Sequence, residues 1–139
     1  MSVFTKNWKL SKGIGLLILR LVFGFVLIYG HGFEKLITIF NGDEIQFANP
    51  IGIGATLSFY LAAFAEGICT ILLILGLFER FAALVLSINF IVILYLHAFV
   101  FGDGFTILEP RFFYLFSFIA LFFTGPGRFS LDYVIPRAE

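Results

Sequence analysis

Residues 81–100 read FAALVLSINFIVILYLHAFV, twenty consecutive positions without an Asp, Glu, Lys or Arg. As an α-helix this run is about 30 Å long, because each residue advances the helix by about 1.5 Å. That length matches the hydrocarbon core of a lipid bilayer. The run therefore predicts a membrane-spanning helix over 81–100.

Two further apolar segments precede this run. The segment from Thr56 to Phe78 contains Glu66 as its single charged residue, and the segment from Ile14 to Tyr29 contains only Arg20. The composition agrees with membrane insertion, since 60% of the 139 residues are hydrophobic and 13% are charged. A soluble domain of this size cannot bury that much apolar surface. The expected solvent of the chain is therefore lipid.

The fourth apolar segment is shorter, because only Phe112 to Thr124 is free of charge, about 20 Å of helix. Glu109 and Arg111 are therefore expected to reach the depth of the membrane or its headgroups, and a half-inserted segment is the alternative. The predicted fold class is all-α, an integral membrane four-helix bundle in one domain over 1–139. Short connections favour antiparallel neighbours. The expected helices cover about 13–33, 55–78, 81–100 and 108–124, with an outer loop over 34–54.

Basic residues near the helix ends are divided unequally between the two sides of the predicted bundle. Lys35 and Arg111 belong to the side that carries the loop over 34–54. The side of the termini carries a larger set: Lys6, Lys9, Lys12, Arg80, Arg128 and Arg137. Lys and Arg in short loops are retained on the cytoplasmic side of a membrane. Both termini are therefore expected in the cytoplasm.

Several polar side chains lie inside the predicted helices, where each costs free energy unless it faces a partner, a cavity or a substrate path. Arg20 and Glu66 lie about 10 and 16 Å from the cytoplasmic ends of their helices. We predict an ion pair between them, with Asn89 as a further hydrogen-bonding partner. Such a pair either fixes the register of the helices or takes part in function.

A second polar group consists of His31, His97 and Glu109, each about 24–27 Å from the cytoplasmic end of its helix. These side chains could bind a quinone headgroup and move its protons, hold a divalent metal, or ligate a haem through the two imidazoles. Tyr29, Tyr95 and many Phe residues favour a lipophilic pocket, although they also fit a lipid-facing belt. The cofactor stays unidentified: quinone is the favoured ligand, and haem or metal at His31 and His97 is the less favoured one.

The charge balance and the single cysteine exclude two classes of function. Nine basic and nine acidic residues give a formal net charge of zero, and no basic stripe is present, so nucleic acid is excluded as a partner. Cys69 lies alone within an apolar segment. It therefore has no partner for an intramolecular disulfide or for paired-thiol redox chemistry.

Short motifs along the whole chain resemble those of the DoxX family of small bacterial membrane proteins. They are LRL at 19–21 with Gly24, HG at 31–32, KL at 35–36, FAE at 64–66, LLILGL at 72–77, GPGR at 125–128 and SLD at 130–132. His97 and Glu109 also match residues of that pattern. The resemblance implies a multi-pass protein of the bacterial cytoplasmic (inner) membrane that is associated with redox complexes or with resistance to oxidants and quinone-like compounds.

These observations predict a redox-associated membrane protein that binds quinone or a similar lipophilic substrate, as a subunit of a membrane oxidoreductase system. The expected site residues are, for catalysis, Glu66, His31 and His97, and, for substrate binding, Arg20, Asn89, Glu109, Tyr29 and Tyr95. One alternative is a non-catalytic membrane partner that recruits or stabilises a soluble redox enzyme. A further alternative is a small transporter, which would need a homo-oligomer. The expected partners are the lipid bilayer, a soluble or membrane redox protein and further copies of the chain.

Overall fold

The computed structural model describes residues 4–136, and in that part of the chain all regular elements are helical. The first long helix consists of α1 (Ser11–Leu27), the π-helical η1 (Ile28–Gly32) and α2 (Phe33–Asn41). The second consists of α3 (Ala55–Ala63), the π-helical η2 (Phe64–Cys69) and α4 (Thr70–Leu75). The third consists of α5 (Glu79–Tyr95) and the π-helical η3 (Leu96–Val100). The fourth is α6 (Phe105–Thr124), and the short α7 (Leu131–Val134) follows it.

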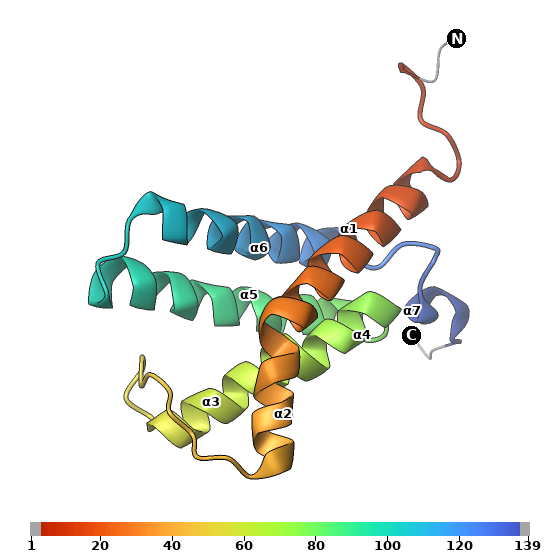
Figure 1. Ribbon diagram of the computed structural model, residues 1–139. Coiled ribbons are helices and arrows are strands. Elements are labelled where there is room, and N and C mark those ends of the chain that lie inside the picture. Colours follow the sequence, from red (N-terminus) through yellow and green to blue (C-terminus); the bar gives the residue numbers. More distant parts are fainter. Residues whose placement is uncertain (1–3, 137–139) are drawn as a thin grey trace.

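Four helices of the described chain are long and apolar enough to cross a membrane, which confirms the predicted all-α membrane fold. They cover Ser11–Asn41, Ala55–Leu75, Glu79–Val100 and Phe105–Thr124. Large apolar side chains such as Phe25, Ile88 and Phe116 are more than half exposed on their outer faces, as expected where lipid is the solvent. The two ends of the described chain, at residues 4 and 136, lie on the same side of the molecule (Figure 1). Arg137, one of the residues behind the predicted orientation, lies outside the described residues.

The first helix is longer than the sequence predicts. It continues through residues 34–41, which were expected to open the outer loop, and ends at Gly42. Gly42 adopts the left-handed conformation with φ 67°, and the backbone N–H groups of Gly42 and Asp43 donate to the carbonyls of Ile39 and Thr38. This pattern closes the last turn of the helix and favours glycine. The connection to α3 is therefore shorter and begins at Gly42.

The core lies mainly between α5 and α6, which run side by side in opposite directions (Figure 1). Phe90 on α5 stacks on Tyr114 of α6 with 5.0 Å between ring centroids, and Phe118 follows one turn later at 6.0 Å from Tyr114. Near the start of α5, Ala82 and Ala83 are fully buried. Small side chains at these positions let neighbouring helices approach closely. This pairing holds the third and fourth spans together as one unit.

The segment after α6 folds back onto the turn between α4 and α5. The carboxylate of Asp132 accepts hydrogen bonds from the backbone N–H groups of Phe78 and Glu79, each at 2.9 Å. The N–H of Asp132 donates in turn to the carbonyl of Gly76 at 2.8 Å. Because the first N–H groups of a helix lack intrahelical acceptors, Asp132 caps the start of α5 from a distance in sequence.

Asp132→Ala removes both side-chain acceptors at the start of α5, so we expect the free energy of unfolding to fall by about 1–2 kcal/mol. Thermal melting of the purified protein in detergent measures the change. Asp43→Ala is the matched control, since Asp43 lies exposed in the loop after α2. Equal melting temperatures for the two variants would contradict the capping role.

Candidate ligand-binding site

A cavity of about 320 Å³ lies among all four spans, near the end of the molecule that carries the α2–α3 and α5–α6 connections. This volume is at the lower end of small-molecule sites. Most of its lining is apolar, with a few convergent polar groups. Its lining residues are His31, Lys35, Gln46, Phe47, Ala48, Glu66, Phe90, Ile93, Leu96, His97, Phe101, Pro110, Arg111 and Tyr114.

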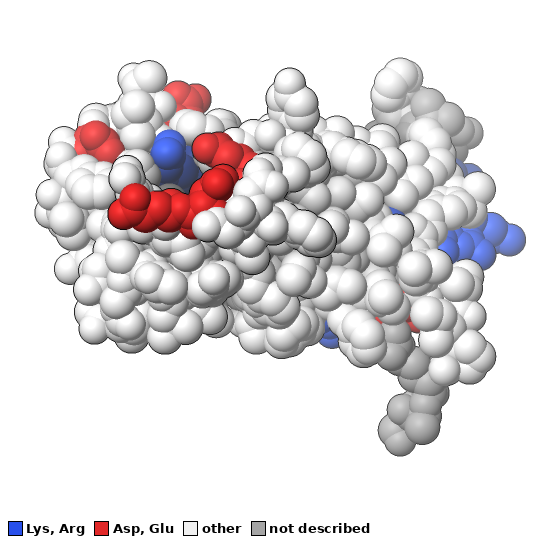
Figure 2. Space-filling view, turned by 60° about the horizontal axis from the view of Figure 1, so that its bottom comes forward, with Lys and Arg blue, Asp and Glu red and all other residues white. Residues whose placement is uncertain are grey.

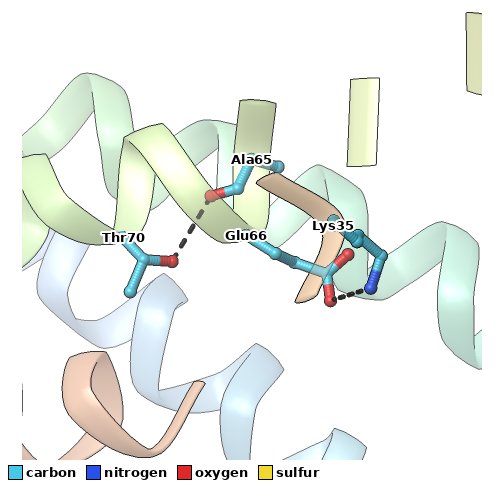
Figure 3. A network of polar contacts seen from close by, with 4 residues as sticks. All are labelled: Lys35, Ala65, Glu66 and Thr70. Atoms are coloured by element: carbon cyan, nitrogen blue, oxygen red, sulfur yellow. Dashed lines mark hydrogen bonds and ion pairs between the residues drawn. The ribbon is translucent and has the colours of Figure 1, made fainter. Parts of the chain in front are cut away.

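The carboxylate of Glu66 and the ammonium of Lys35 form an ion pair within this cavity. Lys35 Nζ lies 3.3 Å from Glu66 Oε1, and the side chains are only 16% and 3% exposed. Figure 3 shows Lys35 reaching Glu66 from the first helix, and the Thr70 hydroxyl donating to the carbonyl of Ala65 at 3.4 Å. Because the first helix continues through α2, Lys35 lies one turn beyond His31 on the same face. The two residues therefore border the same space.

His97 is held in place by the short α5–α6 connection. Its Nδ1 lies 2.6 Å from Oδ2 of Asp103, and its backbone carbonyl accepts a hydrogen bond of 2.8 Å from the Asp103 N–H. The ring edge meets Phe101, with centroids 5.3 Å apart. A carboxylate on one ring nitrogen orients an imidazole and fixes its tautomer. Nε2 is then the nitrogen that can face a ligand.

Each of the three predicted catalytic residues lies in a π-helical segment. His31 belongs to η1, Glu66 to η2 and His97 to η3. A π-helical turn widens the helix and changes the direction of the side chains that follow, and such turns are frequent at functional sites. The three spans therefore change their helical geometry at the level of the cavity.

Two basic side chains, Lys35 and Arg111, line the cavity. Arg111 joins Lys35 from the fourth span, and its guanidinium donates to the carbonyl of Ile107. Figure 2 shows a basic side chain within a hollow at one end of the molecule, with acidic side chains around it. Exposed Glu34, Glu44 and Glu109 belong to the segments that form this end. The cavity thus offers cationic and hydrogen-bond donor groups behind an acidic rim.

Only part of the predicted site is assembled in the cavity. His31, Glu66 and His97 line it together. Tyr29 is 90% exposed, and Tyr95 is 50% exposed and packs on Phe99. Asn89 is half-buried and its amide nitrogen has no hydrogen-bond partner in the described chain. The predicted residues that do not line this cavity are Arg20, Asn89, Glu109, Tyr29 and Tyr95.

The predicted ion pair between Arg20 and Glu66 is wrong. Arg20 is 1% exposed and donates from Nη2 to the backbone carbonyl of Phe129 at 2.6 Å, while Glu66 pairs with Lys35. The carboxylate that acts most strongly on Arg20 is that of Glu79, which is fully buried. The prediction failed because the first helix was expected to end before Lys35. The longer helix brings Lys35 to Glu66, and the folded-back terminal segment brings an acceptor to Arg20.

Several residues of the cavity escaped the sequence prediction: Gln46, Arg111, Tyr114 and Lys35. The spacing of four residues between His31 and Lys35 is the signal that could have found Lys35, because it places both on one face of a continuing helix. Tyr114 and Arg111 carried no comparable signal. Within residues 4–136, no group of three or more His, Cys, Asp or Glu side chains could hold a metal ion. The three-ligand arrangement of His31, His97 and Glu109 is therefore not formed.

The fold and the cavity define a multi-pass helical membrane protein with a polar site enclosed by apolar walls. Comparison with protein families identifies the group: the DoxX model matches residues 15–100. The chain belongs to the DoxX family. The matched segment contains His31, Lys35, Glu66 and His97, and ends before α6. No curated protein and no solved structure matches the chain.

Proposed function

We propose that this protein binds a quinone, or a lipophilic molecule with a similar headgroup, in the cavity around Glu66. In this proposal it serves as a subunit of an oxidoreductase system in the bacterial inner membrane, with both termini in the cytoplasm. The observation that carries the proposal is the buried Lys35–Glu66 pair, which shares an apolar cavity with His31 and His97. Few polar groups within apolar walls are typical of sites for lipophilic ligands.

The polar groups suit the chemistry of a quinone. Its carbonyl oxygens accept hydrogen bonds, and the cavity supplies donors at Lys35, Arg111 and the imidazoles. Reduction to the quinol adds two electrons and two protons to those oxygens. In the proposed reaction a reduced redox partner supplies the electrons. Glu66 and the histidines pass the protons, since imidazole and carboxylate groups exchange them near neutral pH.

Binding of ubiquinone and menaquinone analogues to the purified protein in lipid nanodiscs tests the proposal. Saturable binding at one site per chain and a raised melting temperature are expected, because a ligand that binds only the folded state stabilises it. If neither analogue binds or raises the melting temperature, the proposal fails. In that event a stoichiometric soluble protein that co-purifies would favour the non-catalytic partner role.

Lys35→Met is expected to weaken quinone binding at least tenfold, because it removes a charged donor and leaves Glu66 buried without its partner. A hydrogen bond to a charged group contributes about 1.5–3 kcal/mol. Titration in nanodiscs measures the dissociation constant. Lys12→Met is the control, since Lys12 is exposed near the start of α1, far along the chain from the cavity. A variant that folds and binds quinone as the control does would show that Lys35 does not contact the ligand.

A further inference from the structure

Two apolar hollows lie on the membrane-facing side of the molecule between α1 and α6. The first, of about 300 Å³, has Val22 and Val26 on one wall and Phe113 on the other. The second, of about 410 Å³, lies between Leu19 and Ala120. Together these hollows form what we call the α1–α6 groove. Its walls consist almost entirely of aliphatic and aromatic groups.

The groove adjoins the cavity around Glu66 and shares part of its wall. Pro110 and Tyr114 line both the cavity and the first hollow. Phe113 lines both the first and the second hollow. Along α6 the shared path runs from Pro110 to Ala120, about 15 Å of helix. A molecule whose headgroup occupies the cavity can therefore extend an apolar chain along this face.

The groove is open because α1 and α6 meet over a short distance. In Figure 1 they diverge from their crossing point toward the start of α6, whereas α5 stays beside α6 along its length. Val22 and Val26 are more than half exposed as a result. In a bilayer such a face meets lipid chains, so the groove lies between the hydrocarbon region and the wall that it shares with the cavity.

We infer that the α1–α6 groove is the lateral entrance to the cavity and holds the hydrocarbon tail of the bound quinone. This inference rests on the proposed function and adds to it the class of ligand: a quinone with a long apolar tail that arrives from the bilayer. The tail lies along the hollows at Val22 and Ala120, and the headgroup lies beside Lys35 and the two histidines. The wall that the groove shares with the polar cavity favours this occupant over an ordinary membrane lipid.

Val22→Trp tests the groove, with Ile91→Trp as the matched control. Both side chains are 53% exposed, and Ile91 lies on α5 outside the groove. In nanodiscs, Val22→Trp is expected to weaken binding of decylubiquinone at least fivefold, because the indole occupies the space of the tail. Binding of the tail-less headgroup, dimethoxy-methyl-benzoquinone, is expected to stay within twofold of the unmodified protein. Ile91→Trp should leave both ligands unaffected.

A decylubiquinone with a photoreactive diazirine at the end of its tail locates the tail directly. Mass spectrometry of the labelled protein is expected to find the label within residues 19–26 of α1 or 112–120 of α6. The inference about the groove would be wrong if both quinones bind and the two tryptophan variants have equal effects. It would also be wrong if the label lies on the outer face of α5. Either result would leave the proposed function intact. If neither quinone binds, the proposed function and the inference about the groove are both wrong.

Discussion

Gly32→Ala is expected to lower the free energy of unfolding by about 3 kcal/mol or more, the upper part of the range for overpacking in a tight core. A Cβ atom at Gly32 would overlap the backbone carbonyl of Glu66 and approach the Cα of Gly67. These are backbone atoms of η2, so relief requires the first two spans to separate. Melting of the purified variant and its yield from membranes measure the loss.

Gly30→Ala is the matched control, because Gly30 belongs to the same π-helical turn and its Cβ would meet nothing within 4 Å. We expect its stability to stay within about 1 kcal/mol of the unmodified protein, the scale of helix propensity alone. The same contact holds the first span against η2, the segment that carries Glu66. Equal behaviour of the two variants would show that the helices do not touch at Gly32.

Arg20→Met is expected to lower the free energy of unfolding by about 1.5–3 kcal/mol, the scale of a hydrogen bond to a charged group, and it removes the positive charge that attracts the buried carboxylate of Glu79. Arg20 is 1% exposed and Glu79 is fully buried. Removal of the guanidinium also leaves the carbonyl of Phe129 without its 2.6 Å donor. Denaturation in mixed micelles measures the change. Lys12→Met, on the same helix but exposed, should have little effect.

A double variant separates the through-space attraction between Arg20 and Glu79 from simple loss of packing. Replacement of two buried opposite charges by apolar groups of similar size is often close to neutral. Arg20→Met combined with Glu79→Leu is therefore expected to recover much of the stability that Arg20→Met loses. A double variant less stable than Arg20→Met alone would show that Glu79 is not stabilised by the arginine.

Much of the fold was predictable from hydropathy and turn residues. The apolar run at 81–100 and its neighbours indicated four spans, because lipid requires long apolar helices with internally satisfied backbones. Part of the site was also predictable: helix rise placed His31, His97 and Glu109 at one depth, and the two histidines line the cavity. Glu109 does not line it, and Glu66, which was predicted at another depth, does. Depth is accessible to sequence reasoning because every helical residue adds the same rise.

The sequence by itself determined that the helices are apolar enough for lipid and that four of them are long enough to cross it. Which side chains meet was decided by the tertiary structure. Glu66 pairs with Lys35 because α1 continues into α2, and Arg20 turns to Phe129 because the terminal segment folds back. Depth along a helix does not specify its rotation, its neighbours or the return of a distant segment. Those depend on packing between helices and become defined only when all four are assembled.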